Sequence, residues 1–179
     1  MKDEWGDIPK ETLEEMRRLK ESLRKNQKKF IDQSIENVVT VLRNDPLFKD
    51  ALRRNELIDR LDIVKDLGWP RDRSNAGITD TDLNFIQLYL EKFYGLRNER
   101  NIVAAIGIVA AGNSFHPIID CLEKLEWDGQ PRMRSVLHHF LGVEETELNY
   151  QILKMFMLGA IERLYNPGCK FEMIPCRSS

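Results

Sequence analysis

The stretch NERNIVAAIGIVAAG, residues 98–112, decides the fold of this chain. Its apolar residues lie nearly all round a helix, a pattern typical of a helix buried in a core. Asn98 has the side chain of an N-cap residue, so we expect the helix to begin there. The sequence therefore predicts a central, buried helix.

Amphipathic patterns on both sides of this stretch predict about six or seven further helices. Upstream, we expect them at about Pro9–Phe30, at Ile35–Leu42, at Leu47–Leu52 after the Asp45-Pro46 boundary, and from Thr79, which can form a capping box with Asp82, to Gly95. Downstream, we expect them at Pro117–Leu125, at Arg132–Leu141, and at Glu147–Tyr165, which Asn166-Pro-Gly168 terminates.

One stretch departs from the helical pattern. Residues 56–64 alternate with a period of two, which predicts a short strand or β-hairpin near residues 56–65. The turn-forming residues of Asp66–Gly77 predict a surface loop. The expected fold class is mainly α, with seven or eight helices. The expected segments are a charged helix and linker at 1–31, a small helical unit with the hairpin and loop at 32–78, a helical body at 79–172 and a tail at 173–179.

The composition excludes several classes of protein. Hydrophobic residues at 42% and charged residues at 31% describe a soluble globular chain, not a disordered or fibrous one. A net charge of -2 argues against a surface covered with nucleic-acid contacts, although a local basic stripe can still bind phosphates. The apolar runs are much shorter than the ~20 residues that span a bilayer. We expect a cytoplasmic protein with no membrane partner.

Basic residues gather toward the end of the first predicted helix, at Arg17, Arg18, Lys20, Arg24, Lys25, Lys28 and Lys29. Such a run can neutralise several phosphates. Acidic residues lie near the start of the same helix, and that arrangement also complements the helix dipole. The sequence therefore allows a solvated helix face, which is the simpler interpretation, or a contact with nucleic acid.

No complete catalytic or metal site is predicted. His116 and Asp120 have the spacing of a base and its orienting group, but a histidine that satisfies backbone groups at a helix start explains His116 more simply. Adjacent histidines such as His138 and His139 diverge on a helix and do not converge on a metal. The odd set of cysteines lacks the spacing of a zinc site or disulfide framework: Cys121, Cys169 and Cys176.

The chain contains no G-x-x-x-x-G-K-[ST], G-x-G-x-x-G or G-x-S-x-G run. The first two runs bind nucleotide phosphates and the third carries a serine nucleophile. We therefore expect no cofactor and no ATP binding through a Walker-type loop.

Two ordered stretches, NSFHPIID at 113–120 and LEWDGQPR at 125–132, resemble the virulence-associated protein E family of phages and chromosomal islands. The resemblance extends to Asn44-Asp-Pro46, to residues 88–95 and 140–142, and to NPGCKF at 166–171. Together these segments cover about Ser34 to Phe171.

The resemblance implies part of a DNA-dependent ATPase or helicase that starts replication of a mobile element. In the family, the segment like 167–171 leads through a strand into the phosphate-binding loop, but here residues 172–179 read EMIPCRSS. The resemblance therefore does not imply ATPase activity for this chain. The family signature Trp127-Asp-Gly129 is expected to be an aromatic anchor before a turn.

The expected function is a non-catalytic helical accessory module that contacts DNA. The candidate contacts are Arg17, Arg24, Lys25, Lys28, Lys29, Arg97, Arg100, Arg132 and Arg134. One alternative is a protein-interaction or oligomerisation module, in which the first helix or the end beyond Phe171 binds a replication protein or a second copy. The other is an enzyme, either an ATPase within a longer chain or a hydrolase around His116 and Asp120.

Overall fold

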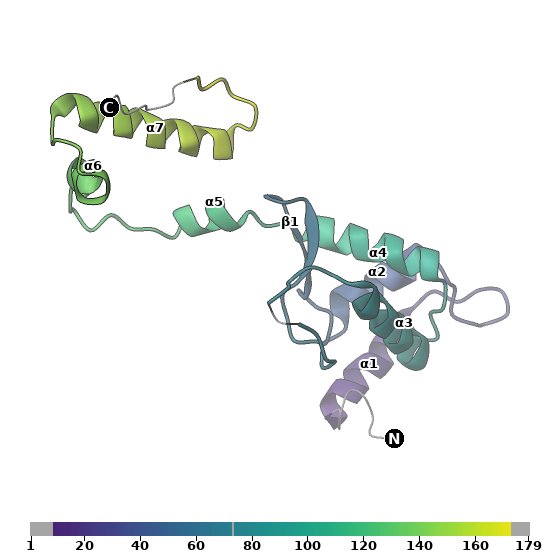
Figure 1. Ribbon diagram of the computed structural model, residues 1–179. Coiled ribbons are helices and arrows are strands. Elements are labelled where there is room, and N and C mark those ends of the chain that lie inside the picture. The colour runs from purple at the N-terminus through teal and green to yellow at the C-terminus, as the bar shows by residue number, and fades with distance from the viewer. Residues whose placement is uncertain (1–8, 73, 173–179) are drawn as a thin grey trace. The chain divides into compact units, whose positions relative to one another are not determined.

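The computed structural model describes residues 9–72 and 74–172, and these form seven helices and one two-stranded antiparallel sheet (Figure 1). The predicted fold class, mainly α with one short hairpin, is confirmed. The chain divides into two compact units, Met1–His116 and Pro117–Ser179. The segment boundaries expected from composition differ from this division and stay a prediction.

The first unit is built around its last helix. Its elements are α1 (Lys10–Ser22), α2 (Ile35–Asn44), β1 (Leu52–Asn55), β2 (Arg60–Ile63), α3 (Asp80–Tyr94) and α4 (Glu99–Gly112). α4 contacts α2, α3 and both strands, so it is central, as predicted. It is not buried all round, because Val103 and Ile108 are 49% and 46% exposed. The unit covers only one side of the helix, and the apolar composition of the other side misled the prediction.

The core of the first unit is mainly apolar, but three carboxylates are also buried, at Asp45, Asp62 and Asp82. Its largest fully buried side chains come from α2, α3, α4, β1 and the loops: Tyr94, Phe48, Leu42, Leu52, Leu67, Ile86, Leu90, Leu96, Ile102 and Ile106. Asp45 is fully buried at the end of α2 and accepts hydrogen bonds from the hydroxyls of Tyr89 (3.0 Å) and Tyr94 (2.6 Å). Burial raises the pKa of Asp45, although these hydrogen bonds work to lower it.

Local signals fixed the ends of α3 and α4. Thr79 and Asp82 form the predicted capping box, in which each side chain accepts from the other residue's backbone amide. Gly95 ends α3 in the left-handed conformation, with φ of 70°. The side chain of Asn98 accepts from the amide of Asn101 and caps α4. All three expectations are confirmed.

The region after α2 differs from the prediction of a third helix at 47–52. Asp45 accepts from the amide of Leu47 (2.8 Å) and closes a turn instead of opening a helix. Leu52 then begins β1, which pairs with β2 in the register Leu52↔Ile63 to Asn55↔Arg60. The hairpin expected near 56–65 is therefore present, but its first strand lies earlier. A buried cross-strand partner outweighed the helical spacing of the apolar residues.

The second unit contains α5 (Pro117–Leu122), α6 (Met133–Leu141) and α7 (Glu147–Tyr165), and α7 contacts both other helices. α5 ends three residues before the predicted Leu125. Gly159 is the one buried residue among those described in this unit. Many of its large apolar side chains are exposed: Ile118, Leu125, Trp127, Phe140, Leu141, Leu148, Met155, Phe156, Met157, Leu158, Ile161 and Tyr165. No helix within the described ranges is long and apolar enough to cross a membrane.

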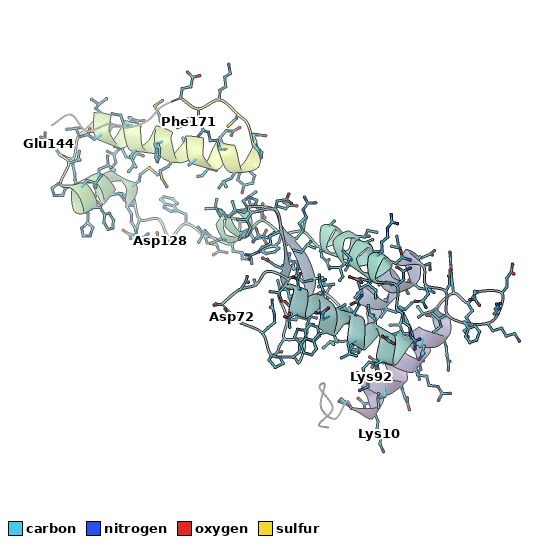
Figure 2. The ribbon with its side chains drawn as sticks, turned by 45° about the vertical axis from the view of Figure 1, so that its right-hand side comes forward. Lys10, Asp72, Lys92, Asp128, Glu144 and Phe171 are labelled. Carbon is cyan, nitrogen blue, oxygen red and sulfur yellow. The ribbon has the colours of Figure 1, made fainter. Side chains whose placement is uncertain are left out.

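The segment after α7 folds back along that helix. Figure 2 shows Phe171 beside α7, where its ring occupies the space that a Cβ at Gly159 would need. The guanidinium of Arg163 donates to the carbonyl oxygen of Phe171 (2.6 Å). A glycine at 159 is therefore what allows the ring to reach the helix backbone.

Candidate nucleic-acid interface

The first helix ends earlier than predicted, and the lysines beyond it lie on a loop. α1 stops at Ser22, and Leu23 packs into the core with 4% of its surface exposed. Residues 24–31, which we name the basic loop, then turn back with an antiparallel bridge between Lys25 and Ile31. The prediction of one helix to Phe30 is wrong. The loop projects from the first unit in Figure 1.

Asparagine side chains explain why the helix does not continue. Asn26 accepts from the amides of Lys28 and Phe30, both at 3.0 Å, and its own amide donates to the carbonyl of Phe30 at 2.8 Å. These local bonds compete with helical hydrogen bonds. Lys29 adopts a left-handed backbone with φ of 63°, which completes the reversal of the chain.

The base of the basic loop is fixed by a buried residue of α2. Asn37 is 2% exposed, and its side-chain oxygen accepts from the amide of Arg24 at 3.0 Å. Its side-chain nitrogen donates to the carbonyls of Arg24 (2.9 Å) and Asp32 (2.8 Å). The side-chain amide of Asn37 thus ties both ends of the loop to the core. These bonds also satisfy every polar atom of that buried amide.

Gln33 joins the basic loop to the connection between α3 and α4. Its side-chain oxygen accepts from the amide of Arg97 (2.6 Å), and its nitrogen donates to the carbonyl of Gly95 (2.9 Å). Its backbone carbonyl accepts from Asn101 (2.6 Å). These bonds bring residues far apart in the sequence to one place.

A groove of about 990 Å³ lies between these segments. Four cationic side chains contribute to its lining, together with one acidic side chain and one exposed aromatic ring: Lys20, Lys25, Lys29, Arg97, Glu21 and Phe30. We name this the basic groove. Three predicted contact residues, Lys25, Lys29 and Arg97, are therefore brought together by the fold.

The cations around the groove differ in how firmly they are engaged. The amine of Lys20 donates to the carbonyl of Phe93 (2.6 Å) at the end of α3. Arg97 pairs with Glu91 at 3.1 Å, but both side chains are exposed, so the pair is weak and can be exchanged for a phosphate. Within residues 9–72 and 74–172, Lys25, Lys28 and Lys29 form no ion pair.

The other predicted contacts lie around or away from the groove. Arg17 on α1 pairs with Glu21 (3.2 Å), and Arg24 pairs with Glu36 (2.5 Å) across the base of the basic loop. Arg100 is exposed in the first turn of α4 and does not line the groove.

Arg132 and Arg134 belong to the second unit and are engaged there. Arg132 donates to both carboxylate oxygens of Asp128 (2.8 and 2.5 Å), and this hydrogen bonding lowers the pKa of Asp128. Arg134 pairs with Glu147 (3.1 Å) and stacks over the ring of Tyr150 at 4.4 Å. The structure therefore gives these two arginines structural partners within the second unit.

Trp127, which precedes the turn at Asp128, was expected to be an aromatic anchor. Asp128 accepts from the amide of Gln130 (3.1 Å), and Gly129 takes a positive φ of 80°, so the predicted turn is present. Trp127, however, is 82% exposed and packs into no core of its unit. Figure 2 places Asp128 on the segment between α5 and α6. The ring precedes a turn, as expected, but it is not an anchor within this unit.

Residues 122–177 match the virulence-associated protein E-like domain. The resemblance inferred from the motifs is confirmed over this segment, which includes the Trp127-Asp-Gly129 signature, α6 and α7. The match thus lies on the second unit, whereas the basic groove lies on the first. A comparison with curated proteins found no match.

The segment that matches the virulence-associated protein E-like domain contains two of the three histidines and two of the three cysteines that were weighed as chemical groups. His138 lies in the last turn of α6, with its Nδ1 3.2 Å from the carbonyl oxygen of Val143. The described residues contain no group of three or more side chains that could hold a metal ion. Cys169 is a free thiol, as is Cys121 in α5, and Cys176 lies outside the described residues.

His116 and Asp120 fall in different units of the chain. His116 closes the first unit and directly precedes α5, as expected for a residue at a helix start. Asp120 lies within α5 in the second unit.

Sequence reasoning missed two groups of the groove, Phe30 and Gln33. The predicted first helix takes Phe30 as the end of its apolar stripe. The stripe breaks at Asn26 and Gln27, where helical spacing requires an apolar residue, and that break was the available signal. The role of Gln33 depends on backbone atoms of the α3–α4 connection and had no signal in the sequence.

Proposed function

We propose that this chain is a non-catalytic helical accessory module of a phage-type DNA replication ATPase or helicase, and that it contacts DNA through the basic groove. The match of residues 122–177 to the virulence-associated protein E-like domain supports the association with mobile elements. The DNA contact rests on one observation: Lys25 and Lys29 of the basic loop line one groove together with Arg97, which comes from a distant part of the chain.

The charge of the groove explains how a chain with a net charge of -2 binds a polyanion. Electrostatic attraction to phosphates depends on the local field, and here four cations outnumber Glu21. The lysines of the basic loop form no ion pair among the described residues, so phosphate binding does not require an ion pair to break there. Each phosphate that is neutralised releases counterions from DNA and makes the affinity fall with salt.

The test is fluorescence anisotropy of labelled DNA, single-stranded and duplex, titrated with the protein at low and moderate salt. We expect binding that weakens steeply with salt. Reversing Lys25, Lys28 and Lys29 to Glu should weaken it and lower the salt slope by about one for each phosphate that the variant no longer neutralises.

The matched control reverses Lys10, Lys49 and Lys65, three exposed lysines of the same unit that do not line the groove. The control changes the net charge by the same amount, so it should weaken binding far less. Equal weakening in both variants would place the contact elsewhere. A protein that binds neither form of DNA at low salt overturns the proposal.

A second candidate function is a protein-interaction or oligomerisation module. The many exposed large apolar side chains of the second unit favour it, because a monomeric protein rarely leaves much apolar surface uncovered. Sedimentation across a wide concentration range tests self-association. A mass that rises with concentration, and that Phe140→Glu returns to the monomer value, would support this function, and a constant monomer mass would contradict self-association.

A further inference from the structure

The basic groove contains an aromatic side chain that phosphate binding does not use. Phe30 is 69% exposed on the basic loop, although it is one of the most apolar residues in the chain. It lies among the cations that line the groove, next to Lys29 in the sequence. A simple electrostatic contact with phosphates does not need an exposed aromatic ring in a groove lined by cations.

The backbone that carries this ring is fixed in place. The amide of Phe30 donates to the side chain of Asn26 and its carbonyl accepts from the amide of Asn26, so both polar groups are engaged. Asn37 ties the two ends of the same loop to the core. A ring on such a loop loses little backbone freedom when a ligand stacks against it.

We propose that the basic groove binds single-stranded DNA in preference to duplex, with the ring of Phe30 as a stacking platform for a base and with Lys25, Lys29 and Arg97 on the phosphates. This inference rests on the proposed function and names the form of DNA for the same site. Proteins that bind single strands without sequence preference combine a positively charged groove with aromatic rings.

A duplex does not use this combination. Its bases cover one another's faces, so a protein ring reaches them only by wedging between base steps or by extruding a base. A single strand instead presents both phosphates and free base faces. The groove lies between the end of α1, the basic loop and the α3–α4 connection, and it is open to a flexible strand.

Affinity for a labelled oligothymidylate of about 15 nucleotides tests this inference. We expect Phe30→Ala to weaken binding by about 5- to 100-fold, the range for loss of one stacked base. The salt slope should stay unchanged, because no charge is removed. Phe30→Trp should restore the affinity. Phe30 is exposed, so the fold is not expected to depend on it.

Two further readouts separate stacking from a structural effect. In the Phe30→Trp variant, the added indole should lose fluorescence on addition of the oligonucleotide, beyond any change in the unsubstituted protein. The duplex of the same length should bind more weakly, and Phe30→Ala should barely change its affinity.

The outcomes distinguish this inference from the proposed function. Binding that the Lys25, Lys28 and Lys29 reversals abolish, but that Phe30→Ala leaves intact, overturns the stacking role and keeps the DNA contact. Equal affinity for single strand and duplex also overturns the preference. Absence of binding to both forms overturns the proposed function itself.

Discussion

The two units of this chain differ in what holds them together. The first unit buries aromatic and aliphatic side chains from all its helices and both strands, including Phe48 and Tyr94. Within the described residues of the second unit only Gly159 is buried, and large apolar side chains face outward along α6 and α7. Because burial of apolar surface is the main stabilising term in folding, we expect the first unit to gain more stability from its own core than the second unit does.

The family match and the proposed DNA-binding groove lie on different units. The family match lies on the unit whose apolar surface is uncovered, and the groove proposed to bind DNA lies on the unit with a full core. A basic groove functions on a rigid scaffold, because its cations must be held in position. The exposed apolar helices are instead suited to binding another polypeptide.

The largest effect that would test the difference between the two units is expected for Asp45→Ala in the core of the first unit. The substitution leaves the hydroxyls of Tyr89 and Tyr94 without their buried acceptor, so we expect a loss of about 2–5 kcal/mol in unfolding free energy. Urea denaturation measures it. The matched control is Asp128→Ala in the second unit, where the carboxylate is exposed and little change is expected. If the two variants lost similar amounts of unfolding free energy, the proposed difference between the two units would be contradicted.

Two helical glycines sharpen the comparison at a smaller scale. A Cβ at Gly107 in α4 meets nothing within 4 Å, so Gly107→Ala should stabilise the first unit by about 0.5–1 kcal/mol. A Cβ at Gly159 overlaps the ring of Phe171, so Gly159→Ala should displace that ring, free the Lys170–Phe171 peptide bond from α7 and speed its cleavage by trypsin. Proteolysis rates and thermal unfolding of both variants measure this. Unchanged cleavage at Lys170 in Gly159→Ala would contradict the packing.

The smallest expected effect is on the pH dependence of stability. Two buried carboxyl groups of the first unit, Asp45 and Asp82, have pKa shifts in opposite directions. Burial raises the pKa of Asp45, so the folded state binds its proton more tightly and stability falls as pH rises from about 4 through the folded pKa. Burial also acts to raise the pKa of Asp82, but hydrogen bonds from Trp69 and Thr79 outweigh it and lower the pKa. The stability due to Asp82 is therefore present above about pH 4 and is lost as pH falls through the folded pKa.

Denaturation across about pH 2–7 checks these signs. The stability difference between the unsubstituted protein and Asp45→Asn should fall with rising pH. The corresponding difference for Asp82→Asn should rise. Parallel slopes for the two variants would contradict the assigned shifts.

The prediction succeeded where the signal is local. The capping box of Thr79 and Asp82 and the glycine at 95 set the ends of α3 within a few residues, because backbone geometry at a helix end depends on adjacent side chains. The ends of α7 were also predicted, since Glu147 and the Asn-Pro-Gly after Tyr165 lie next to the helix.

The prediction failed where a partner lies far along the chain. Leu23 and Phe30 continue the apolar spacing of the first helix and so extend the predicted helix to Phe30, yet Leu23 enters the core and Asn37 holds the loop that follows. Leu52 fits a helical spacing, but its pairing with Ile63 places it in a strand. Hydrogen bonds and burial between distant residues cannot be read from the spacing of one segment.

The sequence by itself therefore determined the fold class, most helix ends and the resemblance to the virulence-associated protein E family, because composition, caps and contiguous motifs are local properties. Only the tertiary structure decided which cations share a site. Lys25 and Arg97 meet at one groove because Gln33 and Asn37 tie the basic loop to the α3–α4 connection and to α2. Those hydrogen bonds join residues that the chain separates, and only folding brings them together.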